Sequence, residues 1–297
     1  MLLRCTASRE GKLNTFLRRE LSMSSSLVSR LKWQNALLVN GAPAHTGHPV
    51  RTGDEVAVRL EETVEGFSPE EMPLSILYED EALIALDKPA GLLTHPSPCR
   101  NDGTLANGLL AYYQKTGQRC GIHPVSRLDR DTFGVVLLAK NAYVHEKFRQ
   151  LHQSGGIRKA YRACVYGVPD ADCGTIDLPV FKLGGGSLLR IVDVRGQQAV
   201  TEFAVLWRWE RTALLALHPI TGRTHQLRLH CLASGWPILG DPQYATDASR
   251  AYSAQCGIAP QQLCAAELAF THPLTGEAVR ILSQQDVLCP EAEDSRL

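Results

Sequence analysis

The spacing of hydrophobic residues changes several times along the chain, and this constrains the fold more than any other feature. Some segments are short apolar runs or alternate with a period of two, which is typical of strands. They span residues 36–39, 56–60, 82–86, 135–139, 158–165 and 203–209. Others repeat apolar residues at helical spacing, and they span residues 13–21, 24–31, 144–151 and 225–233. Because helices do not separate the strands evenly, we predict a mixed α+β sheet and not a doubly wound one.

The first 60 residues are predicted to form a small unit of two helices and short strands. The serines at residues 24–26 can cap the second helix, and Asn40-Gly41 is a strong signal for a tight turn between strands. An acidic stretch that contains glycine and proline follows at residues 61–71 and is typical of a linker. We therefore predict a boundary near residue 68, with residues 1–68 forming one unit and residues 69–297 a larger domain.

Charge is distributed in blocks, although the 31 basic and 31 acidic residues cancel. Residues 1–60 carry a net charge of +5 and residues 101–230 one of +7, whereas residues 61–100 and 231–297 are net acidic. Two basic blocks favour a polyanionic partner if they stay on the surface. Folding can also interleave the blocks and leave no basic surface, and the charge pattern alone leaves both readings open.

Composition and missing motifs exclude several classes of protein. No apolar run approaches the roughly 20 residues of a membrane helix. The nine cysteines are odd in number and contain no C-x-x-C pair, which argues against a disulfide framework and a zinc ribbon. Phosphate-binding, dinucleotide-binding, zinc-protease and serine-hydrolase motifs are all missing from the sequence. We expect a cytoplasmic protein without a signal peptide, a membrane anchor, a metal or a cofactor.

Three charged segments of the larger domain stand out. They are SRLDRDTFG at residues 126–134, RKAYRA at residues 158–163 and TGRTHQLRLH at residues 221–230. In this order, and with Lys88-Pro89-Ala90-Gly91 ahead of them, they resemble the RluA-type (large ribosomal subunit) pseudouridine synthases. The resemblance implies the pseudouridine synthase fold, a largely antiparallel mixed sheet with flanking helices. Residues 10–60 are similar to the S4-type RNA-binding module that often precedes this catalytic domain.

The resemblance also implies a set of site residues. Turning uridine into pseudouridine breaks the bond from ribose to base and rejoins the base through ring carbon 5, so the family needs no cofactor. Asp129 matches the carboxylate that acts as nucleophile or assists proton removal from the sugar, and Arg223 is the cation expected to keep it ionised. Tyr161 would stack on the uracil and take the proton from carbon 5. Leu227 matches an apolar position of the uracil pocket, and Arg127 is a candidate for contacting phosphate or an extruded base.

Other residues receive supporting roles. Arg30 and Lys32 of the first unit are candidates for phosphate contacts with RNA. Lys88 and His225 are predicted to be structural, the first shaping a loop of the site and the second capping a helix. The implied partner is ribosomal or transfer RNA, and the implied protein is a monomer.

The sequence departs from the family pattern at four positions near these motifs. Ser126 stands where histidine is usual, and Phe133 where serine or threonine is usual. Ala245 replaces a common glycine, and Cys264 a common histidine. None of these changes touches the proposed aspartate, tyrosine or arginine, so they bear on the rim of the site and not on the reaction.

Two other functions remain possible at the level of sequence. A run such as residues 127–131 is by default a solvated, salt-bridged turn, and a chain with this fold could be a non-catalytic RNA-binding or ribosome-assembly factor. The intact set of Asp129, Tyr161 and Arg223 argues against that reading. An unrelated hydrolase with paired carboxylates would need Asp129 and Asp131 to act together, and we take their separation by two residues to count against this reading. We expect Asp131 to be structural.

Overall fold

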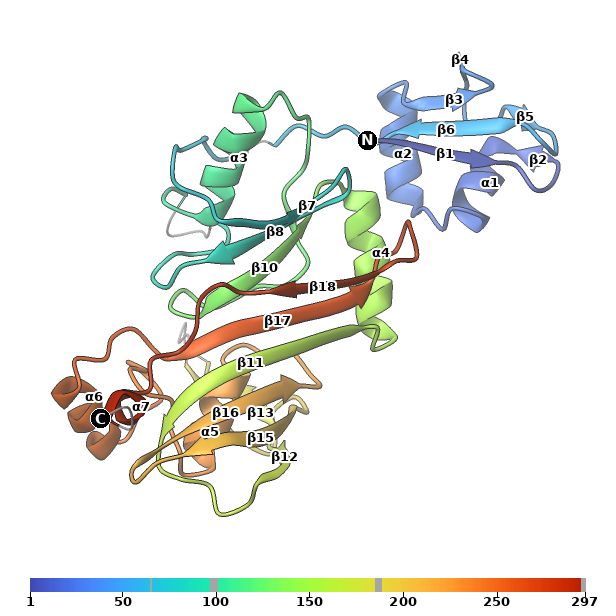
Figure 1. Cartoon of the computed structure of the whole chain (residues 1–297). Helices are drawn as coiled ribbons and strands as arrows, with labels where there is room; N and C mark the ends of the chain where they lie inside the picture. Colours follow the sequence, from blue (N-terminus) through green and yellow to red (C-terminus); the bar gives the residue numbers. More distant parts are fainter. Residues whose placement is uncertain (65, 97–100, 185–188, 295–297) are drawn as a thin grey trace.

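The structure, a computed structural model, describes residues 1–64, 66–96, 101–184 and 189–294. A small N-terminal unit is followed by a larger unit built on a long sheet (Figure 1). The mixed α+β class predicted from the apolar spacing is confirmed, and antiparallel pairing dominates. Within the described residues, no helix combines the length and the hydropathy needed to cross a membrane.

A four-stranded sheet and two helices form the N-terminal unit. The sheet has the order β1-β6-β3-β4, and β2 pairs separately with β5. The elements are β1 (Leu2–Thr6), β2 (Gly11–Lys12), α1 (Leu13–Arg19), α2 (Ser25–Trp33), β3 (Leu37–Val39), β4 (Ala42–Pro43), β5 (Pro49–Val50) and β6 (Glu55–Arg59). Ser24 caps α2 by accepting a hydrogen bond from the Leu27 N–H. Asn40 and Gly41 both have positive φ, as the predicted tight turn requires.

Ten strands form the large sheet, with the order β12-β15-β16-β11-β17-β10-β8-β7 and with β18 and β9 attached to β17 and β10. The strands are β7 (Ile76–Glu79), β8 (Leu83–Lys88), β9 (His123–Pro124), β10 (Phe133–Ala139), β11 (Ile157–Tyr166), β12 (Cys173–Asp177), β15 (Val200–Arg208), β16 (Thr212–Pro219), β17 (Leu263–Thr271) and β18 (Ala278–Leu282). β10 and β17 run parallel at the centre of this order. Segments from distant parts of the chain therefore meet in the middle of the sheet.

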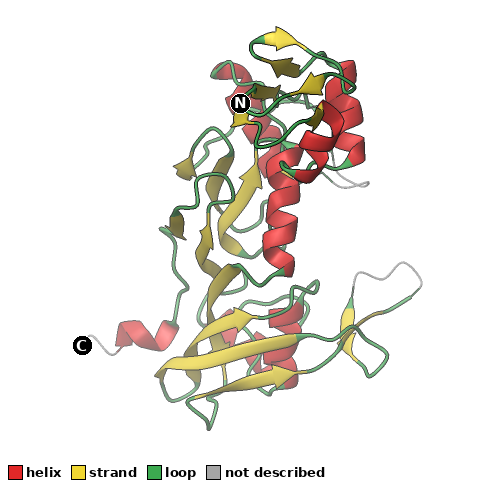
Figure 2. Cartoon of the chain, turned by 90° about the vertical axis from the view of Figure 1, so that its right-hand side faces the viewer, coloured by secondary structure: helices red, strands yellow, loops and turns green. Residues whose placement is uncertain are grey.

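A short hairpin projects from this sheet (Figure 2). It pairs β13 (Val180–Lys182) with β14 (Arg190–Val192). The helices of the larger unit are α3 (Leu105–Lys115), α4 (Ala142–Gln153), α5 (Gln226–Ala233), α6 (Asp247–Gln255) and α7 (Pro290–Asp294). In Figure 2 the hairpin and the C-terminal helix α7 extend to opposite sides of the sheet.

Strand β11 presents two different faces, and this alternation positions the site. Tyr161, Ala163 and Val165 pack in a cluster with side chains of β16 and α5. Cys164 and Tyr166 point the other way, into a cluster near α6 and the C-terminal segment. The predicted period-two pattern of residues 158–165 is therefore confirmed, because successive strand residues alternate between the faces of a sheet.

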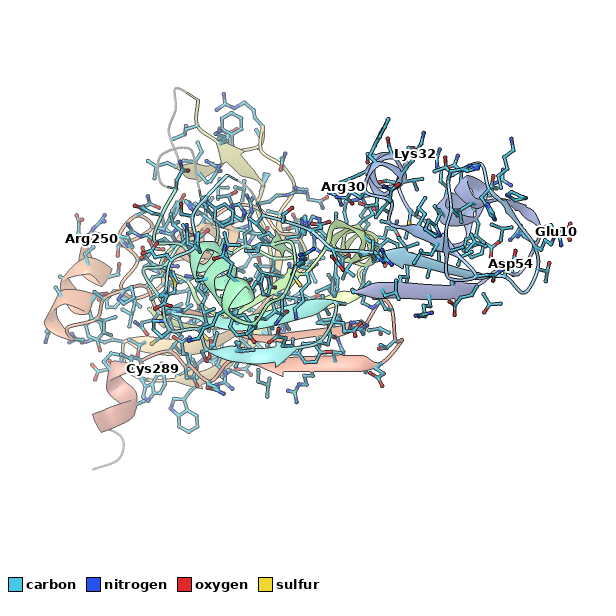
Figure 3. The ribbon with its side chains drawn as sticks, turned by 90° about the horizontal axis from the view of Figure 1, so that it is seen from above. Glu10, Arg30, Lys32, Asp54, Arg250 and Cys289 are labelled. Carbon is cyan, nitrogen blue, oxygen red and sulfur yellow. The ribbon has the colours of Figure 1, made fainter. Side chains whose placement is uncertain are left out.

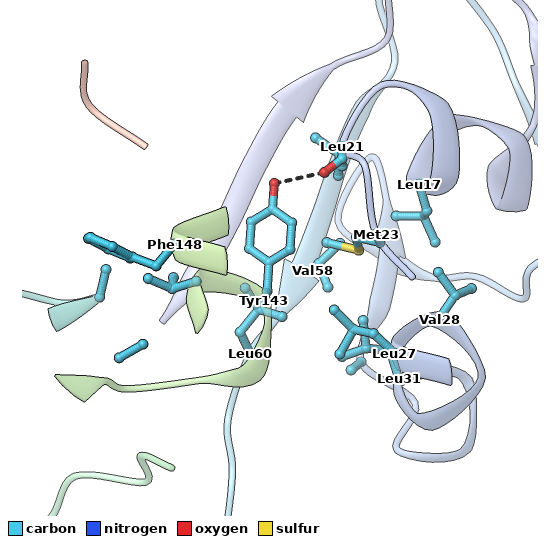
Figure 4. Close-up of a cluster of buried hydrophobic side chains, with 14 of the residues drawn as sticks. Leu17, Leu21, Met23, Leu27, Val28, Leu31, Val58, Leu60, Tyr143 and Phe148 are labelled. Atoms are coloured by element: carbon cyan, nitrogen blue, oxygen red, sulfur yellow. Dashed lines mark hydrogen bonds between the residues drawn. The ribbon is translucent and has the colours of Figure 1, made fainter. Parts of the chain in front are cut away.

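The two units share one hydrophobic cluster (Figure 4). Tyr143, near the start of α4, is buried against side chains of the N-terminal unit, and its hydroxyl donates to the Leu21 carbonyl at 3.0 Å. Glu62 of the acidic linker also connects the two units, because it accepts hydrogen bonds from Arg30 of α2 and from the Ala142 N–H of α4. The boundary predicted near residue 68 thus falls within a segment that is packed against the larger unit.

Candidate active site

Asp129 lies in the loop between β9 and β10, and a buried lysine fixes this loop. The Lys88 side chain is fully buried, and its ammonium donates to the carbonyls of Arg130, Pro89 and Leu92 at 2.8, 2.9 and 2.8 Å. Burial lowers the pKa of Lys88 to about 8, against the opposing effect of the Asp131 and Asp129 charges. One side chain therefore ties the Asp129 loop to the loop that follows β8.

The carboxylate of Asp129 is paired on one side and open on the other. Its Oδ2 accepts a hydrogen bond from Arg228 Nη1 at 3.2 Å, while 28% of the side chain remains exposed. Arg228 is buried and also forms a two-pronged contact with Asp241, in which Nε and Nη2 lie 2.7 and 2.8 Å from the two carboxylate oxygens. A bidentate pair of this kind fixes the guanidinium plane. Arg228 therefore presents its remaining nitrogen to Asp129 in a fixed direction.

The electrostatics of this cluster keep Asp241 ionised. Burial alone would raise the pKa of Asp241, but hydrogen bonds and charge from Arg228 outweigh it, so the pKa falls below the usual value. The pKa of Arg228 rises because its two carboxylate partners outweigh its own burial. The charge of Asp241 alone balances the positive charge of Arg228. The second carboxylate, Asp129, lies at the exposed edge of this cluster.

The structure does not bring the predicted partner, Arg223, beside Asp129. Arg223 is exposed and its Nε donates to the Gln198 carbonyl at 3.1 Å, whereas the cation beside Asp129 is Arg228. The reason is local: Arg223 precedes α5, whereas Arg228 lies on the buried part of that helix, between Leu227 and Leu229. A usable signal was present in the sequence, because an arginine between two inward-facing leucines needs a buried carboxylate partner.

Tyr161 lies where the two apolar groups of the site meet. Its ring packs against a cluster that contains Leu128 and against a second that contains Leu227. These two leucines directly precede Asp129 and Arg228 in the sequence. Burial raises the pKa of Tyr161, and the charge of Asp129 raises it further, so the hydroxyl is protonated at neutral pH. The structure thus brings Tyr161, Leu227 and Asp129 to one place.

The remaining predicted residues lie outside the buried cluster of the site. Arg127 is exposed in the same loop as Asp129. Arg30 and Lys32 lie on α2 of the N-terminal unit (Figure 3), where Arg30 forms an ion pair with Glu62 at 2.7 Å and Lys32 is exposed. These two residues do not join the Asp129 cluster.

Asp131 and Asp129 do not form the carboxylate pair that a hydrolase would need. Arg130 Nε and Nη2 contact its two oxygens at 3.0 Å each, while Asp129 pairs with Arg228. Among the described residues, no three histidine, cysteine, aspartate or glutamate side chains are grouped so that they could hold a metal ion.

Two of the departures from the family pattern are neighbours. Phe133 on β10 is the register partner of Cys264 on β17, in the parallel pair at the centre of the sheet. Both side chains are buried. A larger residue at one position and a smaller one at the other preserve volume, which cores tolerate best. The two departures therefore lie on neighbouring strands inside the sheet.

Similar solved structures define the class of protein. The human RNA pseudouridylate synthase domain containing 4 superposes with a TM-score of 0.58 at 25% identity, covering 72% of this chain and 88% of that one. The human RNA pseudouridylate synthase domain containing 1 superposes with a TM-score of 0.55 at 22% identity, covering 75% of this chain and 94% of that one, and it shows the same fold. The fold is that of the pseudouridine synthases.

The sequence comparisons then give the family. Residues 82–233 match the model of the RNA pseudouridylate synthase family. An uncharacterised RNA pseudouridine synthase of Bacillus subtilis, YjbO, is 34% identical over 88% of this chain and 91% of its own length. The ribosomal large subunit pseudouridine synthase D of Neisseria meningitidis serogroup B is 34% identical over 91% of this chain and 74% of its own. The chain belongs to the RNA pseudouridylate synthase family and is an RNA pseudouridine synthase.

Proposed function

We propose that Asp129 is the nucleophile and that Arg228, in place of the predicted Arg223, pairs with it and orients it. One contact carries this proposal. Arg228, which is buried and held by Asp241, also donates a hydrogen bond to the partly exposed carboxylate of Asp129. A carboxylate of this kind can attack the sugar or assist removal of a sugar proton, so that the bond from ribose to the base nitrogen breaks. The base then rotates and rejoins the ribose through carbon 5.

Tyr161 is proposed to act late in this sequence. Its ring lies between the leucines that precede Asp129 and Arg228 and offers a flat surface to the uracil. Burial is the largest cause that raises the pKa of Tyr161, and the negative charge of Asp129 is the next. When the base rejoins the ribose through carbon 5, the bond between Asp129 and the sugar breaks and the carboxylate is restored. Carbon 5 then still carries its hydrogen, and Tyr161 is proposed to take it as a proton.

The substrate is proposed to be structured RNA, from which the target uridine is splayed out. A uridine in a stem or a stacked loop hides its reacting atoms, and unstacking costs a few kcal/mol. Arg127 is exposed beside Asp129 and is proposed to hold phosphate or the extruded base. We expect large-subunit ribosomal RNA, because the relative in Neisseria carries that substrate in its name, and transfer RNA is the alternative.

The N-terminal unit is proposed to be an S4-type RNA-binding domain that increases affinity for the same RNA. Lys32 on its α2 and the β13–β14 hairpin project toward the same side of the molecule in Figure 3. Arg30 and Lys32 would contact phosphates there, and two modest sites on one chain increase avidity. We expect the protein to work as a cytoplasmic monomer. The Asp129–Arg228–Tyr161 arrangement argues against a role as a non-catalytic RNA-binding factor.

Mapping of pseudouridines in RNA from cells that lack this gene tests the proposal. One or a few positions in ribosomal RNA should remain uridine, and expression of the wild-type protein should restore pseudouridine at those positions. Expression of Asp129→Asn should not restore it. Full restoration by Asp129→Asn would contradict the proposed mechanism, and an unchanged map in transfer and ribosomal RNA would contradict the proposed substrates.

A further inference from the structure

Tyr244 contacts both the projecting hairpin and the charged cluster of the site. Its side chain is buried, and its hydroxyl oxygen accepts a hydrogen bond from the Arg190 N–H of β14 at 2.9 Å. Its ring lies against the Arg228 guanidinium, with Cζ 4.9 Å from the ring centroid. Its own N–H donates to Asp241 at 2.9 Å. One residue thus contacts a hairpin strand and both members of the buried arginine–aspartate pair.

His225 extends this connection to Asp129. Its Nδ1 lies 2.9 Å from the Tyr244 hydroxyl, and its Nε2 lies 3.9 Å from Asp129 Oδ2. The backbone of His225 has a φ of +58°, a left-handed conformation that non-glycine residues rarely adopt, at the first turn of α5. The conformation places the imidazole between Tyr244 and Asp129.

The hydrogen atoms of this connection can be assigned from its surroundings. Burial lowers the pKa of His225, and the Arg228 and Arg190 charges lower it further, whereas Asp129 and Asp241 raise it. The neutral imidazole favours its hydrogen on Nε2, which faces the Asp129 carboxylate. Nδ1 is then an acceptor, and the Tyr244 hydroxyl must donate to it. The Arg190 N–H, the Tyr244 hydroxyl and the His225 Nε2–H therefore all point along this connection in the direction of Asp129.

Apolar packing supports the same connection. Tyr244 shares a cluster with Val180, which begins β13, and with Leu229 of α5. Leu189, next to Arg190, and Val194, which follows β14, are 42% and 94% accessible. The described strands of the hairpin are therefore fixed to the site, while these two neighbouring side chains are exposed to solvent.

We propose that Tyr244 is a positioning residue that couples the seating of the β13–β14 hairpin to the orientation of Asp129 and Arg228. RNA that contacts the hairpin would stabilise the Arg190–Tyr244–His225 connection, and this would hold the carboxylate in its reactive direction. The proposal rests on the proposed function, in which Asp129 reacts with RNA. It assigns to Tyr244 an effect on the reaction step and only a minor one on RNA binding.

Variants that delete single groups test the coupling. Tyr244→Phe removes the hydroxyl and keeps the ring against Arg228, and His225→Gln removes the imidazole. The matched control is Tyr252→Phe, which deletes a hydroxyl that contacts Glu291 near the C-terminus. Rates of pseudouridine formation on one RNA give kcat and KM for each single variant and for the Tyr244→Phe/His225→Gln double variant.

We expect Tyr244→Phe and His225→Gln each to lower kcat about tenfold, because a small misorientation of reacting groups is costly. KM should change less than about twofold, and the double variant should be no slower than the slower single one, as for residues that act through one another. A kcat for Tyr244→Phe equal to that of Tyr252→Phe, or effects that multiply in the double variant, would overturn the proposal. If Tyr244→Phe does not fold, His225→Gln alone tests the proposal. A lower kcat with little change in KM would support it, and an unchanged kcat would overturn it. An inactive wild-type enzyme would instead count against the proposed function.

Discussion

At the scale of single residues, Arg228 connects the two carboxylates on which the site depends. Its guanidinium is held by Asp241 and contacts Asp129, which lies 99 positions earlier in the sequence. A lysine at this position would keep the charge but lose the two-pronged geometry. The identity of the cation beside Asp129 is therefore open to a direct test.

Arg228→Lys should lower the rate of pseudouridine formation at least about tenfold and reduce the free energy of unfolding by about 1–3 kcal/mol, because buried hydrogen bonds to charged groups are lost. Arg223→Lys is the matched control, since Arg223 is exposed, and it should leave stability unchanged. Single-turnover rates and urea unfolding measure both effects. A loss of activity confined to Arg223→Lys would show that the Asp129 partner is misassigned.

Tyr161→Phe separates stacking from proton transfer. The ring stays between its two apolar clusters, so RNA binding and folding should be retained. Product formation should fall at least about 100-fold, the usual scale for loss of a general acid–base group, while cleavage of the bond from ribose to base still occurs. Chromatography of nucleosides from the RNA after reaction detects both products. Turnover at the wild-type rate would remove Tyr161 from the proton-transfer role.

At the scale of elements, the site depends on how the loops after β8 and β9 are joined. The Lys88 ammonium connects the two loops by donating hydrogen bonds to three backbone carbonyls. Its pKa of about 8 lies below the ordinary value of 10.5 because of burial. Between these two values the unfolded chain holds more protons than the folded one, so this group adds stability as the pH rises.

Lys88→Met should lower the free energy of unfolding by about 1–3 kcal/mol, because buried carbonyls lose their donor, and should slow the reaction by loosening the Asp129 loop. The stability difference from wild type should grow as the pH rises from 7 to about 9.5. Lys115→Met, at an exposed position of α3, is the control. Urea unfolding at several pH values measures the difference. A difference that shrinks with pH would contradict the proposed burial effect.

Elements with a local signal could be predicted from the sequence, and contacts between distant segments could not. The cap at Ser24, the turn at Asn40 and the alternation along β11 depend on neighbouring residues, and the structure has all three. The pairing of Phe133 with Cys264 and of Arg228 with Asp129 depends on which strands become neighbours. Motif order placed Asp129, Tyr161 and Leu227 together, but it pointed to Arg223, whereas the arginine that contacts Asp129 in the structure is Arg228.

At the scale of the whole molecule, the N-terminal unit is joined to the catalytic unit by shared apolar packing and by Glu62. Tyr143 is the side chain that links them most closely (Figure 4). RNA bound to both units would therefore contact one connected body. The larger unit retains further hydrophobic clusters of its own, around α3, α5 and α6.

Deletion of residues 1–60 should leave a folded but less stable protein, because Tyr143 and its neighbours lose their cover. The urea midpoint should fall, and activity on a short RNA that contains the target uridine should persist. Affinity for a long RNA should decrease and its salt dependence become shallower, since fewer phosphates are neutralised. Binding measurements at several salt concentrations test this. An unchanged affinity and salt slope would show that the N-terminal unit does not bind RNA.

The central claim is that Asp129 is the reacting carboxylate, and one comparison tests it most directly. RNA that carries tritium at carbon 5 of uridine releases it when pseudouridine forms. Asp129→Asn should release less than about 0.1% of the wild-type amount, with folding intact, whereas Asp131→Asn should retain most of the activity because Asp131 contacts Arg130 and not the site. Release by Asp129→Asn at a rate near wild type, or an inactive Asp131→Asn beside an active Asp129→Asn, would contradict the account.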